Sequence, residues 1–324
     1  MPYFDAPIEE LRAYRSAVVA PDDLDDYWQE ALAAARADAR PPVFTPYRTT
    51  VYRGIDVFDV TFSGAAGDPV RAWFLCPHGA DGRLPCRVTF IGYGGGRGEA
   101  AEHALYAAAG YAELVVDSRG QGGSWGSGAT GDPGAGASGP EAPGVMTRGV
   151  LDRRSYYYRR LYVDAVRGVE TAAGHERVDP DRIAVAGFSQ GGAMALATAA
   201  LLPDRIRLCQ AHMPFMCDIP HAISIAAEPP YTELVDYLSV NQEHIPTVLD
   251  TLRYVDNAVL SPRIRASTTV TAGLMDGCCP PSTVFAAYNA ITAPKRMLEY
   301  DYCDHELAGH HIERELEEFA TALG

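Results

Sequence analysis

Ile-Ala-Val-Ala-Gly-Phe-Ser-Gln-Gly-Gly occupies residues 183–192, and residues 193–202 behind it have the composition of a helix. The apolar first half predicts a buried strand, so the pattern indicates a strand, a tight turn and a helix. Gly187 and Gly191 stand two residues before and two residues after Ser189. A turn this tight accepts only small residues at those two positions. The stretch therefore predicts a strained turn that pushes the Ser189 hydroxyl out above the sheet edge.

This Gly-x-Ser-x-Gly arrangement is typical of the nucleophile elbow of α/β-hydrolases. A five-residue match alone is equally compatible with a flexible turn, because a short motif is only a hypothesis until its context agrees. Here the strand and the helix on either side favour the elbow. The sequence therefore predicts the α/β class, as an α/β-hydrolase fold with a mostly parallel central sheet and helices on both faces.

The remaining strand and helix signals fit this fold. An antiparallel N-terminal part is predicted from alternating patterns, and a buried parallel sheet from short apolar runs between turns and helices. The alternating patterns lie at 47–53, 56–62 and 70–74, and the apolar runs at 88–91, 112–116, 183–186 and 269–272. Helices are predicted at 22–40, before two prolines, and at 312–323.

The 324 residues predict one domain over 1–324. Residues 1–40 read as an N-terminal helical extension. Residues 120–149, rich in glycine, alanine, serine and proline, and residues 213–262, with several helical patches, read as insertions near a pocket or an oligomer interface. Neither internal repeats nor a second domain is indicated.

Charge and hydropathy restrict the partners. The 27 basic and 42 acidic residues give a net charge of −15, which disfavours nucleic acid and anionic membranes. Residues 1–11 lack the basic start and apolar core of a signal peptide. No run reaches the roughly 18 apolar residues of a membrane span. We expect a cytoplasmic protein that acts on a small molecule.

A nucleophilic serine needs a base, which is oriented by a third group, and in this fold the order along the chain is serine, acid, histidine. His305 follows directly after the predicted last strand, 297–302, which makes it the best-placed base. His310 and His311 fall at a helix start, where solvent exposure is expected. His305 is therefore the predicted base.

The acid is expected at the carboxyl end of the preceding strand, because active-site residues of open parallel sheets gather at such ends. Asp276 ends the predicted strand 268–275 and is the choice. Asp301 would lie within the last strand, Asp304 adjoins the base and is badly placed to reach its far nitrogen, and Asp256 lies in a segment of uncertain structure.

A tetrahedral oxyanion needs two backbone N–H donors. One is predicted at Gln190, directly after the nucleophile. The other is predicted at Tyr93, in the glycine-rich loop 92–96 after the strand at 88–91. An ordinary or phosphate-binding glycine loop is the alternative, but the spacing does not give the dinucleotide pattern.

The seven cysteines form an odd, scattered set without CxxC spacing. This pattern predicts reduced thiols, with neither a disulfide framework nor a metal site. Cys278 and Cys279 lie close to Asp276, and we interpret them as small packing residues in preference to a redox switch.

Three motifs in order carry a family resemblance: Arg119-Gly120-Gln121, the elbow at 187–191 and His305-Glu306. Two longer runs, 146–159 and 280–289, also look alike. On these motifs the chain resembles the acetyl xylan esterases and cephalosporin C deacetylases (carbohydrate esterase family 7), from about residue 22 to the C-terminal helix. Residues 124–144, the Cys278-Cys279 pair and residues 211–218 do not match, which leaves the substrate open.

The resemblance implies roles residue by residue. Its catalytic set is Ser189 as nucleophile, Asp276 as orienting acid and His305 as base, its oxyanion donors are Tyr93 and Gln190, and Arg119 and Gln121 brace the loops around the nucleophile. It further implies a cytosolic, cofactor-free homohexamer that admits small acetylated substrates, such as xylo-oligosaccharides or cephalosporin C, and excludes polymers.

The function predicted from the sequence is thus acyl-enzyme hydrolysis of small acetyl esters. Another short-chain carboxylesterase is an alternative. A peptidase of the prolyl oligopeptidase type shares the elbow, but no propeller repeats precede Ser189. An inert scaffold would need a broken triad, and no member of the triad is missing.

Overall fold

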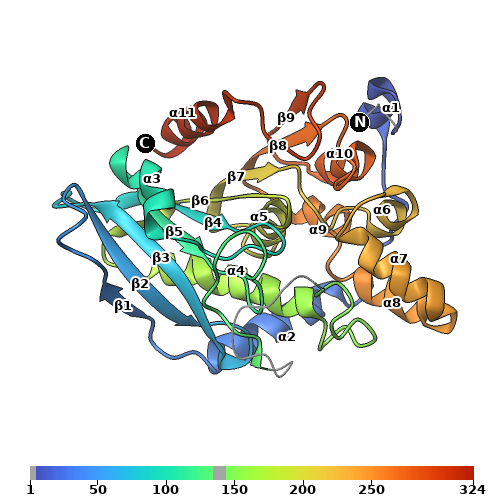
Figure 1. Ribbon diagram of the computed structural model, residues 1–324, viewed down its shortest axis with the longest axis horizontal. Coiled ribbons are helices and arrows are strands. Elements are labelled where there is room, and N and C mark those ends of the chain that lie inside the picture. Colours follow the sequence, from blue (N-terminus) through green and yellow to red (C-terminus); the bar gives the residue numbers. More distant parts are fainter. Residues whose placement is uncertain (1–4, 134–143) are drawn as a thin grey trace.

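A single nine-stranded sheet forms the centre of the computed structural model, which describes residues 5–133 and 144–324 (Figure 1). The strand order is β1-β2-β3-β5-β4-β6-β7-β8-β9. β1 to β3 pair antiparallel, β3 joins β5 antiparallel, and all later pairs are parallel. The strands are β1 (Val43–Pro46), β2 (Ile55–Ser63), β3 (Pro69–Pro77), β4 (Leu84–Phe90), β5 (Ala112–Val116), β6 (Val178–Phe188), β7 (Ile206–His212), β8 (Ser267–Gly273) and β9 (Lys295–Tyr300).

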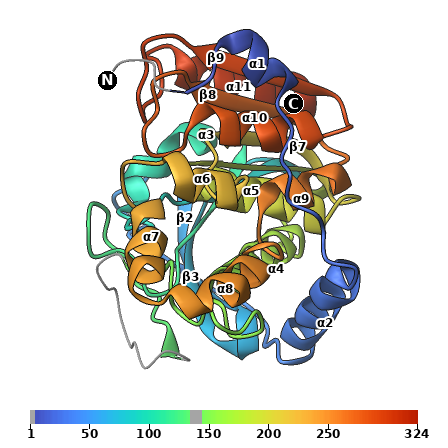
Figure 2. The same ribbon diagram turned by 90° about the vertical axis from the view of Figure 1, so that its right-hand side faces the viewer.

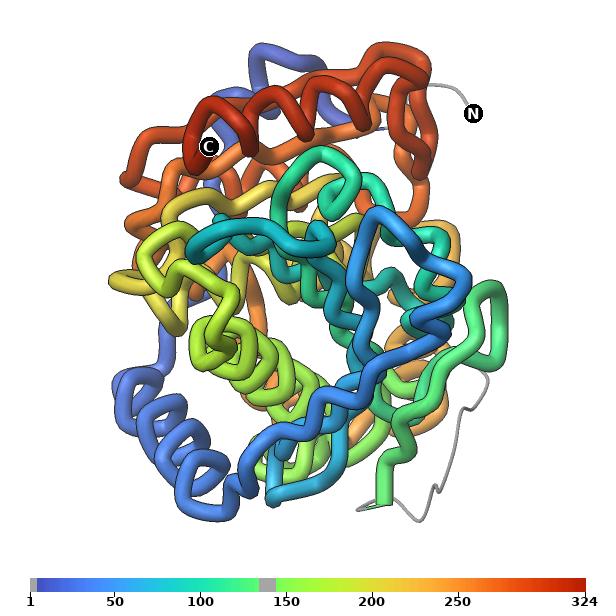
Figure 3. Tube along the Cα trace, turned by 90° about the vertical axis from the view of Figure 1, so that its left-hand side faces the viewer, coloured from blue at the N-terminus to red at the C-terminus, as the bar shows by residue number. Residues whose placement is uncertain are grey.

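Helices cover both faces of the sheet (Figure 3). The α-helices are α1 (Ile8–Ala13), α2 (Leu24–Ala37), α3 (Ala104–Ala108), α4 (Tyr157–Ala173), α5 (Gln190–Leu201), α6 (Ile219–Ile225), α7 (Tyr231–Val240), α8 (Ile245–Leu252), α9 (Asn257–Leu260), α10 (Pro281–Ala290) and α11 (His311–Leu323). Among the described residues, no helix combines the length and the apolar character that crossing a membrane requires.

Alternation along β6 shows how one strand serves two cores. Ile183 and Val185 belong to the large cluster under α2, α4, α5 and α10, whereas Ala184 packs with Phe319 and Leu323 of α11 on the other face. Successive side chains of a strand point to opposite faces, so a central strand of this kind must be apolar throughout. Burial on both faces is therefore why residues 183–186 form a continuous apolar run.

The predicted fold class is confirmed, with two strand errors. No strand forms at 47–53; the strand lies just before it, at β1, because Arg48 adopts a left-handed φ of 44° that breaks the extended chain. β7 was missed altogether. It carries the polar residues Arg207 and Gln210, and Gln210 is buried because its side-chain amide donates to the Glu315 carbonyl and the Glu318 carboxylate.

The insertion 213–262 contains the predicted helices, α6 to α9, and Figure 2 shows α6, α7 and α8 gathered on one side of the molecule. The described residues of the other insertion, 120–133 and 144–149, form no α-helix and no extended strand. Residues 134–143 of that predicted insertion, and residues 1–4 of the predicted extension, lie outside the described residues.

A buried polar cluster fixes α11 to the sheet. Arg87 of β4 pairs with Glu315 of α11, and Glu315 also accepts from His212 Nε2 at 2.8 Å. His311 bonds through Nδ1 to the Tyr300 hydroxyl at 2.7 Å. His311 is therefore buried, and the expectation that it is solvent-exposed is wrong. A helix start is not exposed when its first residue faces the sheet.

Protonation of this cluster opposes folding. Burial, together with the neighbouring His212, lowers the pKa of His311 from 6.5 to about 4. Burial alone would raise the pKa of Glu315, but Arg87 and His212 hold it well below its usual range. In acid the unfolded chain therefore takes up protons before the folded protein does, and both groups make the folded state less stable as the pH falls.

We predict that His311→Gln makes stability less dependent on pH. Between about pH 7 and about pH 4 the free energy of unfolding of the unmodified protein should fall by about 2 kcal/mol more than that of the variant, because only the unmodified protein has this histidine to protonate. Urea unfolding across the range measures both slopes. His310→Gln, at the exposed neighbouring histidine, is the matched control. Parallel curves for unmodified protein and His311→Gln would contradict the assignment.

Candidate active site

Ser189 lies in a strained turn between β6 and α5. Its backbone has φ 58° and ψ −118°, a conformation that side-chain-bearing residues rarely adopt. The turn is held because the Ser189 N–H donates to the His212 carbonyl at 2.8 Å. A Cβ on Gly187 would come within 2.4 Å of Gly191, and one on Gly191 would come within 2.2 Å of the Phe90 carbonyl oxygen. Both glycines are therefore required by close backbone contact.

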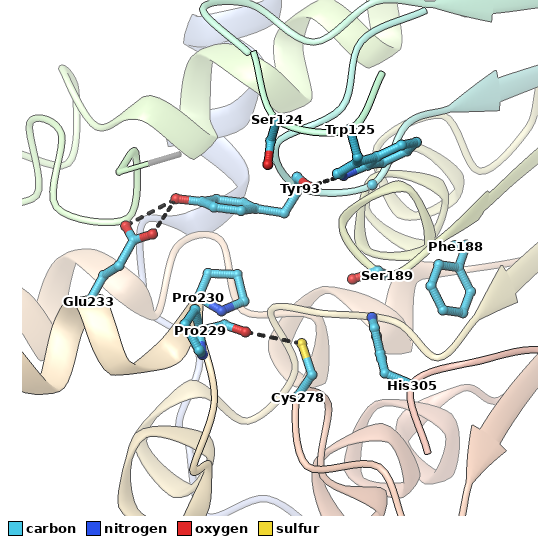
Figure 4. A pocket seen from close by; sticks show the side chains of 11 residues that line it. Tyr93, Ser124, Trp125, Phe188, Ser189, Pro229, Pro230, Glu233, Cys278 and His305 are labelled. Carbon is cyan, nitrogen blue, oxygen red and sulfur yellow. Dashed lines mark hydrogen bonds between the residues drawn. The ribbon is translucent and has the colours of Figure 1, made fainter. Parts of the chain in front are cut away.

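Asp276 and His305 meet at the carboxyl end of the sheet. His305 Nδ1 lies 2.7 Å from Asp276 Oδ2. The carboxylate is fully buried, and its Oδ1 accepts the backbone N–H groups of Cys278 and Cys279 at 2.8 and 2.7 Å. Nε2 of His305 is left to face the cavity that Ser189 also lines (Figure 4).

The electrostatics favour a basic imidazole. Burial lowers the pKa of His305, but the hydrogen bonds with Asp276 and Cys278 outweigh it and raise the pKa above its ordinary value. The Phe188 ring packs against the imidazole with centroids 4.7 Å apart. In its neutral form, an imidazole with a raised pKa is a stronger base toward a hydroxyl group beside it.

In the described parts of the chain, none of the three rival acids bonds to His305. Asp304 Oδ1 accepts the Gly277 N–H at 3.1 Å. Asp256 is fully buried and caps α9, accepting from Ala258 N at 2.8 Å. Asp301 lies exposed in the turn after β9 and not within the last strand, because that strand ends at Tyr300. Among the described residues, Asp276 is the carboxylate that bonds to His305.

The two predicted oxyanion donors lie next to one another in the fold. Neither the Tyr93 N–H nor the Gln190 N–H has a hydrogen-bond partner within the described parts of the chain. Gln121 ties their two segments together. Its Oε1 accepts the Gly94 N–H at 2.6 Å, and its Nε2 donates to Gln190 Oε1 at 2.9 Å and to the Tyr157 hydroxyl at 2.7 Å.

Arg119, two residues before Gln121 in the chain, is fully buried. Its guanidinium forms a two-pronged pair with Asp164, with Nε–Oδ2 at 2.5 Å, and reaches Asp132 and Asp68 at 3.2 and 3.1 Å. Bidentate pairing of this kind fixes both partners in one geometry. These contacts place Arg119 in a buried ionic framework, and it is not among the residues that line the cavity.

The cavity above Ser189 has a volume of about 320 Å³. Part of its wall comes from the two insertions, in which the sequence indicated no individual lining residue. Trp125, 65% exposed, donates through Nε1 to the Tyr93 carbonyl at 2.7 Å. Glu233 of α7 accepts the Tyr93 hydroxyl at 2.7 Å. The lining residues are Gly92, Tyr93, Ser124, Trp125, Phe188, Ser189, Pro229, Pro230, Glu233, Cys278 and His305.

The two adjacent cysteines lie in different environments. Cys279 is buried in the core, as a packing residue should be. Cys278 packs beside it but also lines the cavity, and its Sγ lies 3.3 Å from the Pro229 carbonyl oxygen. Hydrogen bonds with Cys279 and His305 lower the pKa of the Cys278 thiol to about 6, although burial acts in the opposite direction.

A model of the acetyl xylan esterase (AXE1) family matches residues 1–323. The chain belongs to the acetyl xylan esterase family. Acetyl esterase Axe7A of Xylanibacter ruminicola is 33% identical to it over 157 residues, which make up 48% of this chain and 34% of that protein. The match therefore spans about a third of the length of this curated relative.

Two solved structures are similar to the present chain over nearly its whole length. Acetyl xylan esterase from Paenibacillus sp. R4 is 35% identical, with a TM-score of 0.91 over 98% of this chain and 100% of that chain. Acetyl xylan esterase 1 from Thermoanaerobacterium sp. JW/SL YS485 is 30% identical, with a TM-score of 0.91 over 99% of this chain and 100% of that chain.

A more distant likeness concerns the fold alone. Porphyromonas gingivalis dipeptidyl peptidase 4 is 18% identical, with a TM-score of 0.60 over 85% of this chain and 37% of that chain. The esterase family and such peptidases share the α/β-hydrolase core, which explains why the elbow motif by itself could not separate the two.

We predict that Gln121→Ala lowers kcat for ester hydrolysis by about tenfold or more and changes KM little, because Gln121 positions the loop that carries the Tyr93 N–H. It should also lower the melting temperature, since it leaves the buried Gly94 N–H unpaired. Steady-state kinetics and thermal unfolding measure the two effects. Gln242→Ala, which removes a glutamine that bonds to the Leu238 and Ser239 carbonyls and lies outside the cavity lining, is the control. A loss confined to the melting temperature would mean that Gln121 is only structural.

Proposed function

We propose that the protein hydrolyses small acetyl esters through a Ser189–His305–Asp276 acyl-enzyme mechanism. The observation that carries the proposal is the 2.7 Å hydrogen bond from His305 Nδ1 to buried Asp276, together with the presence of His305 and Ser189 in the wall of one cavity. A serine, its base and the group that orients the base form the minimal apparatus for acyl transfer. Membership of the acetyl xylan esterase family supports the choice of acyl group.

The reaction has two halves. In the first, the Ser189 hydroxyl attacks the ester carbonyl carbon while its proton passes to His305 Nε2. Asp276 holds the Nδ1 proton and stabilises the imidazolium. The backbone N–H groups of Tyr93 and Gln190 receive the oxyanion. The intermediate collapses, and His305 returns the proton to the leaving alcohol. In the second half, water attacks the acetyl-serine in the same way and releases acetate.

The cavity supports a small acyl group and a sugar-like alcohol. About 320 Å³ holds a small substrate only, at the lower end of the range for ligand pockets. The exposed indole of Trp125 offers a flat apolar surface at the rim, against which the apolar face of a sugar ring can lie, and Glu233 supplies hydrogen-bond acceptors for sugar hydroxyls. Acetylated sugars, xylo-oligosaccharides among them, are the substrates we propose.

The cytoplasmic location and the hexameric assembly implied by the family resemblance stay predictions. Reduced, free cysteines throughout the described chain are in keeping with a reducing compartment. Sedimentation analysis of the purified protein measures the assembly state.

We predict that Ser189→Ala loses at least about a thousandfold in kcat for p-nitrophenyl acetate, because the covalent route is removed and the oxyanion hole alone remains. It should also escape labelling by a fluorophosphonate probe. Ser239→Ala, at an exposed serine of α7, is the control and should keep both. Unchanged hydrolysis or full labelling of Ser189→Ala would refute the mechanism, and an unlabelled unmodified protein would favour an inert scaffold.

We predict that Trp125→Ala raises KM for an acetylated xylo-oligosaccharide about fivefold, the equivalent of about 1 kcal/mol for ~50 Å² of apolar sugar face. Ethyl acetate has no ring to stack, so its KM should hardly change. Trp125→Phe keeps a flat ring but lacks the N–H that donates to Tyr93, so it should restore most of the sugar KM. Equal losses on both substrates, or no rescue by phenylalanine, would contradict a stacking role.

A further inference from the structure

A cluster of metal-binding atom types lies within the active site itself. Cys278 and Cys279 each offer a sulfur and His305 offers a ring nitrogen, and the three atoms lie within 4.8 Å of one another. Neither thiol transfers a proton or forms a bond in the Ser–His–Asp steps, although the hydrogen bond with Cys278 helps to raise the pKa of His305. Figure 4 shows the Cys278 sulfur on the same side of the cavity as the His305 ring.

We propose that Cys278, Cys279 and His305 form a binding site for a soft divalent cation of the Zn²⁺ and Cd²⁺ class, and that the bound cation blocks the esterase. The blocking rests on the proposed function, since it requires His305 to be the base. A cation on Nε2 occupies the lone pair that would accept the Ser189 proton.

The ligand geometry suits a tetrahedral metal. Zinc–sulfur bonds of about 2.3 Å and zinc–nitrogen bonds of about 2.0 Å place neighbouring ligand atoms roughly 3.5–3.8 Å apart, so small side-chain rotations close the present cluster around an ion. Two thiolates and a neutral imidazole balance a divalent charge. The thiol protons pass to solvent, and no atom changes oxidation state.

Asp276 organises all three ligands. Its Oδ2 holds His305 Nδ1, which leaves Nε2 for a metal. Its Oδ1 accepts the N–H groups of Cys278 and Cys279, and this fixes the backbone that carries the two sulfurs. A carboxylate behind a ligating histidine is the usual support of protein zinc sites, because it sets the ring orientation and raises the basicity of the ligand.

An ion can reach the site. Cys278 and His305 line the cavity of about 320 Å³, whereas Cys279 lies beneath them with 1% exposure. The fourth position of a tetrahedral ion would face the cavity, where water or the Ser189 hydroxyl can complete it. Three protein ligands with one open position is also the arrangement of catalytic zinc sites. Because Cys278 and His305 line the cavity, an ion can enter without unfolding of the loop.

A second cluster, His212, His311 and Glu315, has similar spacing but opposes a cation. The Arg87 guanidinium already pairs with Glu315, and a metal ion there would be repelled by this fixed positive charge. Among the groups that face the Cys278 cluster, the described residues place a carboxylate, Asp276, and the Pro229 carbonyl oxygen. The surroundings therefore favour a cation at the cysteines.

The first test measures binding without activity. The reduced, metal-free full-length protein is titrated with Cd²⁺, and the ultraviolet sulfur-to-cadmium charge-transfer band is recorded. We expect one ion per chain with a band of two-thiolate intensity. Cys278→Ala, Cys278→Ser and Cys279→Ala should each weaken binding at least about a hundredfold, because each removes a ligand. Cys303→Ala, at a partly exposed cysteine outside the cavity lining, is the matched control.

The second test measures inhibition. Zn²⁺ should inhibit hydrolysis of p-nitrophenyl acetate by the unmodified protein and by Cys303→Ala, and a chelator should reverse the effect. Cys278→Ala should need at least about a hundredfold more Zn²⁺ for the same fractional inhibition. Circular dichroism establishes that each variant is folded, and if Cys279→Ala is not, the two Cys278 variants decide.

The outcomes separate this proposal from the proposed function. A full band in Cys278→Ala, or a band lost in Cys303→Ala, overturns the site. A charge-transfer band without inhibition of ester hydrolysis overturns the proposal that the bound cation blocks the esterase. Ser189→Ala keeps the three ligands and should therefore keep the charge-transfer band. Esterase activity that survives in Ser189→Ala would refute the acyl-enzyme mechanism but would leave the binding result unchanged.

Discussion

The close approach of α5 to the end of β4 is the constraint on which the rest of the site depends. Gly191 faces the Phe90 carbonyl so closely that a side chain there would lie 2.2 Å from the oxygen. Because no side chain separates the two segments, the first turn of α5 lies against the loop that follows β4. Ser189, the Gln190 N–H and the Tyr93 N–H are thus brought to one edge of the sheet. The serine and both oxyanion donors follow from a single backbone contact.

Buried polar side chains preserve this arrangement by bonding to two segments at once. Gln121 joins the Tyr93 loop to Gln190, and Asp276 joins the loop after β8 to the loop after β9. An unpaired polar group would be costly in such a place, so each bond also penalises movement of either segment. Buried hydrogen bonds therefore hold the site from two segments at a time, although most of it is built from loops.

Local spacing was enough to predict the turn at Ser189 and the proximity of Asp276 and His305, because each residue follows an apolar strand and parallel strands bring their carboxyl ends to one edge. Contacts that form only in three dimensions could not be predicted. β7 was not predicted because Gln210 is polar and yet buried by α11. The burial of His311 was not predicted because the start of its helix faces the sheet. Trp125 and Glu233 reach the cavity from two insertions that lie far apart in the sequence. No periodic pattern in the sequence predicts that these two side chains meet there.

At the proposed cation site of Cys278 and Cys279, one imidazole would serve two chemistries. A histidine whose Nδ1 is held by a buried carboxylate presents a basic Nε2, and that is what both a serine and a metal ion require. Whether such a histidine serves a serine alone or also a metal ion depends on the side chains of the neighbouring loop, here Cys278 and Cys279. Cysteines are not needed there to hold Asp276, because backbone N–H groups do so, and any residue type except proline supplies them. The two thiols are therefore not needed to hold Asp276, and their position against His305 is what would let a cation control the esterase.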